Sequence, residues 1–469
     1  MHSSEDPVGD PSGRPDRPRM TAAEGPAPAS PDEEAQDGAR QALLSPRYLK
    51  LLLLSVLLGV PISLACFFFM GLLHWLQNEV WTSLPKAVGY KQPPWWWPLP
   101  ALALAGVILA PIVSRVPGRG GHVPVNGLGG APVGPRELPG AVVAALATLP
   151  LGVVLGPEAP LMALGSGLAL FAMRGMTHGK SPADPQAVAL VATAGSTAAI
   201  STILGGPIVA AILVAEAAGL AGARLVVLLM PCFVASATGA VVFTGFGEWT
   251  GLSIGGLSLP TVPPDVDPDA GDFLWGIPLA VLIAAGVALT RGLGRVTHRW
   301  TTARLTAPRT IACALAVGVL ITAYALITGR SPEEAALSGQ VTLAQLAAQP
   351  GAWSVGALLA LVVCKGLAWG ICLGSLRGGP IFPSLMLGAA AALACAGLPG
   401  FGATPALALG MCAAVTAVLG LPLSASVLTV LLMGPDAHDQ MPLIMIAAVV
   451  AHLTVLLVNR WRGASPRKE

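Results

Sequence analysis

The stretch LGPEAPLMALGSG, from Leu155 to Gly167, places one carboxylate among Ala, Leu, Gly, Met, Pro and a single Ser. Glu158 is the only charged residue between Glu137 and Arg174. An acid of this kind is rare in a soluble core, and in a membrane segment it usually marks an ion pathway. The setting of Glu158 therefore decides both the fold and the function of the chain.

The composition indicates a membrane setting. Hydrophobic residues make up 54% of the chain and charged residues 11%, whereas soluble domains carry about 25% charged residues. Apolar runs recur from Leu49 to Val458, and many are cut by Gly and Pro. We therefore predict an all-α polytopic membrane protein with broken helices, whose ends line a buried polar path.

Charge and cysteine usage argue against other classes of function. The net charge of +2 is not gathered into a basic stretch interleaved with aromatic residues, so we expect no nucleic-acid partner. We expect no metal and no cofactor, because the seven cysteines are scattered singly through apolar runs without a CxxC pair. They are predicted to be small core residues: Cys66, Cys232, Cys313, Cys364, Cys372, Cys395 and Cys412.

Polar segments divide the chain into two long apolar regions. The predicted division is a disordered cytoplasmic tail (residues 1–45), a first membrane repeat (46–255), a polar loop (256–272), a second membrane repeat (273–462) and a short tail (463–469). Basic residues flank the first and last spans, which predicts both termini in the cytoplasm and a multi-pass protein of the plasma (inner) membrane. No signal peptide is expected, because no apolar core follows a basic start.

Each half shows the same order of Gly/Pro breaks. The first half has GPEAP at Gly156–Pro160 and GGPIVAAILVAE at Gly205–Glu216. The second half has GGPIFP at Gly378–Pro383 and GLPLSASVLTVL at Gly420–Leu431. Matching breaks predict an internal repeat with a binding site between the halves. These residues alone leave open whether the repeat is inverted or parallel.

The breaks predict an anion site made of backbone. A proline in the first turn suits a helix start, so GPEAP and GPIFP each predict a helix N-terminus. Several such ends meeting at one point would present free N–H groups and positive dipole ends to it. Glu158 lies among these amides, so its carboxylate can take the place of a mobile anion. The alternative is that Glu158 only caps its own helix.

These motifs resemble the CLC family of chloride channels and chloride/proton antiporters. The family's gating motif, a Gly, a basic residue, Glu, Gly and Pro at a helix start, resembles Gly156–Pro160. Its Gly-x-Phe-x-Pro motif is similar to Gly379–Pro383, and its Gly-Ser-Gly-Ile-Pro motif to Gly120–Pro124. Its later helices resemble GGPIVAAILVAEAAG and GLPLSASVLTVLLMG, and the resemblance extends from about Arg47 to Arg460.

The resemblance implies two inverted structural repeats, a homodimer and one anion pore in each subunit. It assigns the gate to Glu158 and makes chloride the transported ligand. The expected partners are a second copy of the chain, the lipid bilayer and small inorganic anions. Anion binding, mainly by backbone, is implied for residues at the breaks: Gly120, Gly121, His122, Gly156, Pro157, Ala159, Ile381 and Phe382.

The chain also departs from the family pattern. The family's chloride-coordinating serine corresponds to Gly121, and its coordinating tyrosine has no counterpart, because Tyr324 is the last tyrosine of the chain. The second, proton-handling glutamate of the antiporters corresponds to Ala217, and Ile381 replaces the phenylalanine of the Gly-x-Phe-x-Pro motif. We therefore expect a weak central anion site and little proton coupling.

Four further residues leave alternatives open. Glu216, inside an apolar helix, either bonds to backbone or handles protons and ions. His122 is either a loop-bonded histidine or a pH sensor. Lys365 and Arg377 bracket the span before GGPIFP, and they either attract anions into a vestibule or extend to a membrane interface.

The function predicted from these observations is transport of chloride or a similar small anion through a pore gated by Glu158. Transport is expected to be channel-like or weakly proton-coupled, and the chain is not expected to be an enzyme. One alternative is a proton-coupled chloride antiporter. Another, from a different class, is a membrane sensor or interaction protein on the same fold that no longer conducts.

Overall fold

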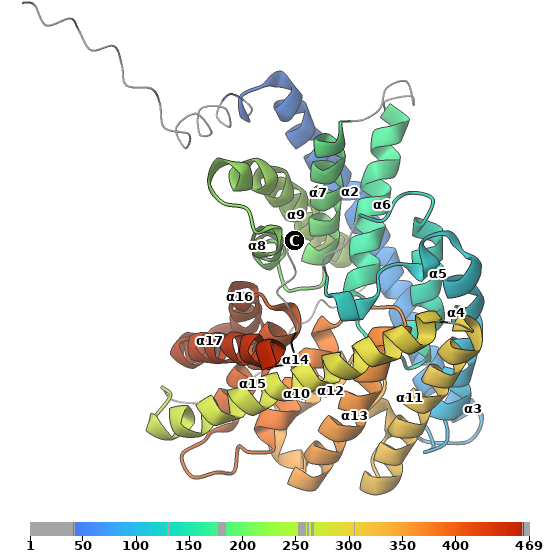
Figure 1. The fold of residues 1–469 in the computed structure, drawn as a ribbon, viewed down its shortest axis with the longest axis vertical. Coiled ribbons are helices and arrows are strands. Elements are labelled where there is room, and N and C mark those ends of the chain that lie inside the picture. The colour runs from blue at the N-terminus through green and yellow to red at the C-terminus, as the bar shows by residue number, and fades with distance from the viewer. Residues whose placement is uncertain are drawn as a thin grey trace, which may run out of the picture.

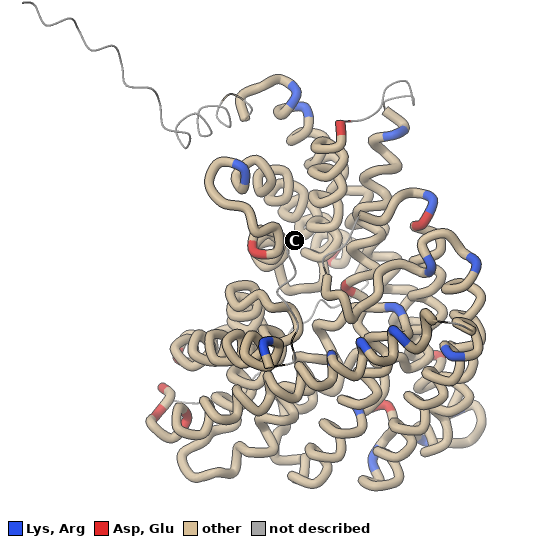
Figure 2. The backbone as a smooth tube through the Cα atoms, in the orientation of Figure 1, with Lys and Arg blue, Asp and Glu red and all other residues tan. Residues whose placement is uncertain are grey.

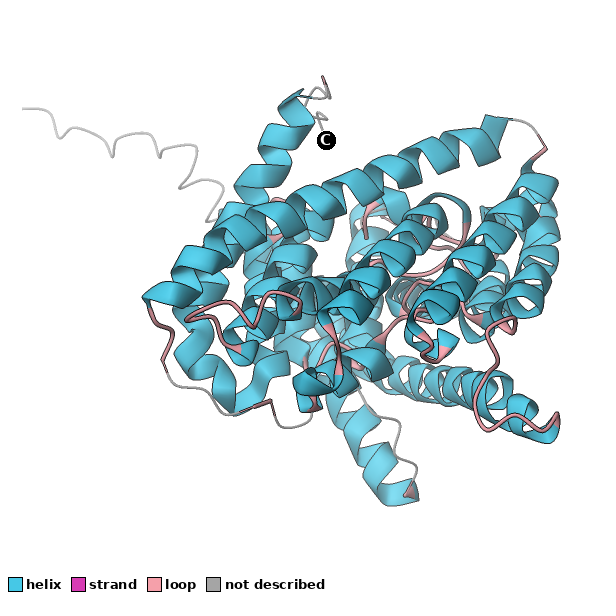
Figure 3. Cartoon of the chain, turned by 90° about the horizontal axis from the view of Figure 1, so that it is seen from below, coloured by secondary structure: helices cyan, strands magenta, loops and turns pink. Residues whose placement is uncertain are grey.

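The computed structural model describes residues 41, 43–128, 132–176, 184–251, 259, 262–263, 267–303, 305–461 and 463. The described residues form helices joined by short loops, without any named β-strand (Figures 1 and 3). Charged residues are sparse along the helices (Figure 2). The predicted all-α membrane architecture is confirmed. Residues 1–40 and 42 of the expected tail, and residues 256–258, 260–261 and 264–266 of the expected loop, lie outside the described residues.

The helices fall into two successive sets. The first consists of α2 (Pro46–Asn78), α3 (Leu84–Ala87), α4 (Pro98–Arg115), α5 (Leu138–Thr148), α6 (Glu158–Met176), α7 (Pro185–Ser201), α8 (Pro207–Ala218) and α9 (Gly222–Thr250). The second consists of α10 (Ala270–Ala303), α11 (Thr306–Thr328), α12 (Gln340–Ala348), α13 (Val355–Ser375), α14 (Ile381–Leu393), α15 (Ala403–Leu419), α16 (Pro422–Met433) and α17 (Ala437–Trp461).

Long and short apolar helices are interleaved, as the Gly/Pro breaks predict. Eight of the described helices are long and apolar enough to cross a membrane. Others are shorter, among them α14 with 13 residues and α8 and α16 with 12 each. A helix of that length rises only about 20 Å, which is less than the ~30 Å of a hydrocarbon core. The short helices therefore begin or end inside the molecule.

The two sets pack in the same pattern. Helix α6 packs on α7 as α14 packs on α15, α2 packs on α9 as α10 packs on α17, and α8 packs on α9 as α16 packs on α17. The two sets are thus two structural repeats, as the matching breaks predict. They meet most extensively where α4 packs on α11, and also along α8 and α16 (Figure 1) and at the starts of α6 and α14.

Paired glycines repeat at equivalent helix crossings. On α6 and α7, a Cβ atom added to Gly165 would lie 2.2 Å from the carbonyl oxygen of Gly195, and one added to Gly195 would lie 2.4 Å from that of Gly165. On α14 and α15, the corresponding distances for Gly388 and Gly410 are 2.1 and 2.3 Å. Because only glycine lets these backbones approach so closely, each half uses the small-residue packing typical of membrane helices.

The starts of α6 and α14 join the halves through the backbone. The amide of Gly156 donates to the carbonyl of Gly379 over 2.8 Å, and the amide of Gly379 donates back over 2.6 Å. This reciprocal pair is an antiparallel bridge. The bridge joins the first glycines of GPEAP and GPIFP, and in the repeated motif Gly156 corresponds to Gly379 and Glu158 to Ile381. The antiparallel direction agrees with inverted repeats, the alternative that the resemblance favours.

We predict that Gly195→Ala lowers the free energy of unfolding by about 2 kcal/mol or more, because a methyl group there would collide with backbone that cannot rotate away. The matched control is Gly366→Ala on α13, where an added Cβ meets nothing within 4 Å. A helix-interior Gly→Ala change of that kind is expected to stabilise by roughly 0.5–1 kcal/mol. Thermal unfolding of the detergent-solubilised proteins measures both, and equal effects would contradict the packing argument.

Candidate functional site

Glu158 is the first residue of α6 and is fully buried between the two halves. Its Oε1 accepts a hydrogen bond from the backbone amide of Phe382, in the first turn of α14, over 2.8 Å. The amides of Ile381 and of Glu158 itself also face the carboxylate. The carboxylate of one half thus sits on the N-terminal amides of a helix from the other half, a position that suits a negative charge.

The second oxygen, Oε2, lies between two glycines. It has no hydrogen-bond partner among the described residues. A Cβ atom added to Gly156 would lie 2.1 Å from Oε2, and one added to Gly379 would lie 1.9 Å from it. Only a glycine pair leaves room for the carboxylate in this position. A buried carboxylate oxygen without a donor is unfavourable, so this seat holds Glu158 less firmly than a fully bonded site would.

The predicted backbone donors divide into bonded and available groups. The amide of Gly156 is bonded to Gly379, and Pro157 has no amide hydrogen, so neither offers a donor to an anion. Pro380 likewise contributes none. The amides that remain at the two helix starts are those of Glu158, Ala159, Ile381 and Phe382. The bridge between Gly156 and Gly379 holds together the two helix starts that carry these amides, and their role as an anion site stays a prediction. Gly379 was missed, although its Gly-Pro pair repeats Gly156-Pro157.

A tight turn at Gly118–Gly121 explains the missing serine. The four φ angles in this turn are all positive, at 73°, 49°, 78° and 93°. Position 121 has the largest of them, and its amide donates to the carbonyl of Gly118 over 2.8 Å. A Cβ atom on Gly121 would lie 3.2 Å from that of Ala141. Glycine is therefore the residue this backbone accommodates, and a hydroxyl side chain there would be strained.

His122 follows the turn and is bonded within its own loop. Its Nε2 hydrogen-bonds the carbonyl oxygen of Gly127. Burial lowers the pKa of His122, the bond to Gly127 raises it, and the positive charge of Arg377 lowers it further. The imidazole is therefore neutral at neutral pH. This geometry favours the loop-bonded alternative over the pH sensor.

Lys365 and Arg377 are both buried, so the alternative in which they extend to a membrane interface is wrong. Lys365 on α13 is fully buried, and its ammonium donates to the carbonyls of Ala336 over 2.6 Å and Glu334 over 3.3 Å. Arg377, between α13 and α14, is 9% exposed. Long cationic side chains usually carry their charge to water when the backbone allows it. Lys365 and Arg377 do not do so, and both keep their positive charge inside the molecule.

Glu216 joins the halves at a second place. Its Oε1 accepts from the amide of Leu423 over 2.9 Å, and its Oε2 accepts from the amide and the hydroxyl of Ser424 over 2.7 and 2.6 Å. Leu423 and Ser424 lie in the first turn of α16, where backbone amides lack partners within the helix. Glu216 therefore caps a helix of the other repeat, which favours the alternative in which it bonds to backbone.

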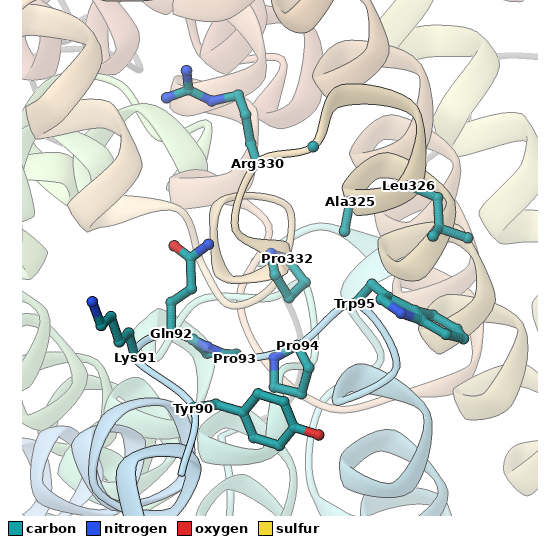
Figure 4. A pocket seen from close by; sticks show the side chains of 11 residues that line it. Tyr90, Lys91, Gln92, Pro93, Pro94, Trp95, Ala325, Leu326, Arg330 and Pro332 are labelled. Carbon is teal, nitrogen blue, oxygen red and sulfur yellow. The ribbon is translucent and has the colours of Figure 1, made fainter.

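A cavity of about 440 Å³ lies elsewhere, between the segment that precedes α4 and the end of α11. Figure 4 shows Tyr90, Pro94 and Trp95 on it, together with Arg330. Arg330 is engaged in an ion pair of 2.9 Å with Glu334 and lies over the ring of Trp353. None of the predicted site residues lines this cavity. Among the described residues, no cluster of three His, Cys, Asp or Glu could hold a metal.

Comparison with known proteins identifies related sequences. The sequence profile described as "Voltage gated chloride channel" matches residues 124–456. The "Putative ion-transport protein YfeO" of Escherichia coli (strain SMS-3-5 / SECEC) is 37% identical over 132 residues, which is 27% of this chain and 32% of that protein. The match thus spans about a third of the length of this relative.

Solved structures with the same fold are also similar. A CLC-type fluoride/proton antiporter is 17% identical with a TM-score of 0.66, and the match covers 86% of this chain and 95% of that one. A slow cyanobacterial Cl⁻/H⁺ antiporter is 18% identical with a TM-score of 0.70, covering 90% and 100%. A eukaryotic CLC transporter is 15% identical with a TM-score of 0.66, covering 88% and 72%. These similarities confirm the predicted fold class.

We predict that Glu216→Ala lowers the free energy of unfolding by roughly 1–2 kcal/mol, because two first-turn amides of α16 lose their acceptor. The matched control is Glu248→Ala, which removes an exposed acid from α9 and should change stability by no more than about 0.5 kcal/mol. Thermal unfolding in detergent compares the two. Equal stabilities would show that the cap between the repeats contributes nothing.

Proposed function

Because the chain belongs to the voltage-gated chloride channel family, we propose that it carries chloride or a similar small anion across a membrane, with Glu158 as its gate. The observation that carries the proposal is the hydrogen bond from the Phe382 amide to the buried Glu158 carboxylate. A carboxylate bound to first-turn amides occupies a position that also suits an inorganic anion.

The gate follows from competition for one position. The charged carboxylate of Glu158 occupies the amides at the start of α14 and excludes a mobile anion. Protonation removes its charge and with it the attraction to these amides, so the side chain can leave and an anion can enter. The unbonded Oε2 supports this proposal, because a seat that satisfies only part of the carboxylate releases it more readily.

We propose that transport is channel-like or only weakly coupled to protons. An internal relay needs an acid that can take up and release a proton, since an isolated charge inside a membrane is costly. Ala217 stands where the family's antiporters carry their second acid. The neighbouring acid, Glu216, accepts three hydrogen bonds from α16 and so is held in place. The antiporter alternative would need water or another group in that role.

We also propose that the chain forms a homodimer in the plasma membrane with both termini in the cytoplasm. Large apolar side chains are exposed on α8, α9, α16 and α17, for example Ile208, Val241, Leu423 and Met445. Apolar surface on this scale needs lipid or a second copy to cover it. Family membership supports the dimer, and the basic residues flanking the outermost spans support the orientation.

Flux from liposomes tests the function. The purified protein is expected to release chloride from loaded vesicles, while the internal pH changes little under a chloride gradient at a fixed membrane potential. Parallel vesicles with nitrate or fluoride establish the preferred anion. Sustained uphill proton movement that is lost in Glu158→Gln would identify an antiporter. If none of the three anions is released, the non-conducting sensor is favoured.

A further prediction concerns the dependence of anion flux on pH. Wild-type flux is expected to rise as pH falls, because protonation discharges the Glu158 carboxylate and lets it leave the anion position. Glu158→Gln should remove this response and conduct at least as fast as the wild type at every pH. His122→Asn is the control and should keep the wild-type pH profile, because burial lowers the pKa of His122 and so disfavours its charged form. Abolished flux in a folded Glu158→Gln protein would contradict the gate.

Another prediction concerns Gly156, one of the two glycines that leave room for the Glu158 carboxylate. In Gly156→Ala, the three nearest atoms to the new methyl group all belong to the Glu158 carboxyl, which is the mobile end of a side chain. The carboxylate should therefore be displaced, giving severalfold higher flux with little pH response. The control is Gly175→Ala at the other end of α6, where an added Cβ meets nothing within 4 Å.

The double variant Gly156→Ala/Glu158→Gln separates displacement from other effects of the methyl group. If the methyl group acts only through the carboxylate, the double variant should match Glu158→Gln alone. An intact pH response in Gly156→Ala, or a further effect in the double variant, would show that Glu158 does not gate from this seat.

A further inference from the structure

Arg377 is a buried cation that the proposed gate does not use. We propose that its guanidinium is an anion-binding group of this transporter, which supplies at the Gly118–Gly121 turn the donors that the missing hydroxyl side chains do not supply. The inference rests on the proposed function, because it assigns a further binding group to the same anion path.

The guanidinium has donors to spare. Its Nε donates to the carbonyl of Arg119 over 3.0 Å, and its Nη1 donates to the carbonyl of Leu376 over 3.1 Å. A guanidinium carries five N–H donors, so these two bonds leave three. In the described part of the chain, no carboxylate lies within ion-pair distance of Arg377. A charge this deeply buried is unfavourable without a counter-charge, and an incoming anion can provide one.

The side chain also spans the two predicted anion-binding segments. Arg377 lies two residues before Gly379, whose backbone contacts the Glu158 carboxylate. Its own side chain crosses to the other half, where its Cγ would lie 3.4 Å from a Cβ atom on Gly120. The guanidinium therefore lies at the turn that contains Gly121, the position that corresponds to the family's coordinating serine. The backbone of Arg377 belongs to the segment that leads into α14.

The neighbouring charges do not replace it. His122 lies near Arg377 but is neutral at neutral pH, because burial and Arg377 itself lower its pKa. The Arg119 side chain is exposed; its carbonyl accepts a hydrogen bond from Arg377, and its positive charge repels that of Arg377 and does not pair with it. Lys365 directs its ammonium to the carbonyls of Ala336 and Glu334, beside Gly339 and Met386. Arg377 is thus the cation placed to meet an anion at the turn.

The planar fork of a guanidinium gives the site a specific consequence. Two parallel N–H groups favour anions that accept two hydrogen bonds, such as nitrate, over a single-atom anion. An ammonium in its place would act as a point charge with less geometric preference. Replacing Arg377 should therefore change both the affinity for anions and the order in which they bind.

The experiment compares three variants of the full-length protein. Arg377→Gln keeps hydrogen-bond donors but removes the charge, Arg377→Lys keeps the charge but removes the fork, and Arg224→Gln removes an exposed arginine charge in the first turn of α9, outside the proposed site, as the matched control. Calorimetric titration with chloride and nitrate in detergent gives affinities. Liposome flux gives the half-saturating chloride concentration separately from the maximal rate, and thermal unfolding gives stability.

Arg377→Gln should bind chloride about tenfold or more weakly and raise the half-saturating concentration in flux, since a hydrogen bond to a charged group is lost. Arg377→Lys should bind chloride with intermediate affinity and lose preference for nitrate over chloride. Arg224→Gln should match the wild type. If Arg377→Gln fails to fold, the lysine variant alone decides, and wild-type affinity and selectivity in it would overturn the inference.

The outcomes separate this inference from the proposed function. A wild-type protein that neither binds nor transports chloride or nitrate overturns the proposed function and the inference with it. A wild-type protein that transports, while Arg377→Gln keeps its affinity within about twofold, overturns the inference alone. Loss of stability in Arg377→Gln with unchanged affinity would assign Arg377 to holding the turn through the Arg119 carbonyl.

Discussion

The two hydrogen bonds between Gly156 and Gly379 are the constraint on which the site depends. They hold the first turns of α6 and α14 against each other, and the two glycines leave room between them for the Glu158 carboxyl. The amides of the next residues are then directed to one point, where Glu158 lies. A protein with a membrane interior cannot leave such amides without an acceptor, because no water is present to bond them. The helix starts that the bridge holds together therefore need an anionic acceptor, and the carboxylate of Glu158 is that acceptor.

Two prolines reduce the number of backbone amides that need an acceptor at this site. Pro157 and Pro380 follow the bridging glycines and remove one amide donor from each helix start. Gly121 stands where the family has a serine hydroxyl, and its backbone φ of 93° disfavours any residue with a side chain at this position. The result is a site with fewer donors than the sequence resemblance implies. Buried cations are one way to restore attraction for an anion without adding backbone donors, and Arg377 and Lys365 both face inward.

Sequence alone predicted the parts of this arrangement that are local. The Gly/Pro breaks predicted where α6, α8, α14 and α16 begin, and the isolation of Glu158 predicted that it lies with helix starts. Partners far apart in the chain were not predictable: Glu216 bonds to Ser424, 208 residues away, and Arg377 bonds to Arg119, 258 residues away. The direction of the Arg377 side chain depends on a turn with four positive φ angles, which composition does not specify. Such contacts follow from the packing of one half on the other.

The backbone of the site is symmetric, but its chemistry is not. GPEAP and GPIFP place Glu158 and Ile381 at equivalent positions, so only one half contributes a carboxylate to the shared site. The tenth residue of α8 is Glu216, whereas the tenth residue of α16 is Leu431, so only one of these two helices carries an acid that caps the other. A fully symmetric pair of carboxylates at the bridge would repel each other at close range and drive one to become protonated. Keeping a single acid at each place avoids that conflict. It also leaves the amides of α14 with a single side-chain acid as acceptor, and the proposed gate requires that this one acceptor can be exchanged for an anion.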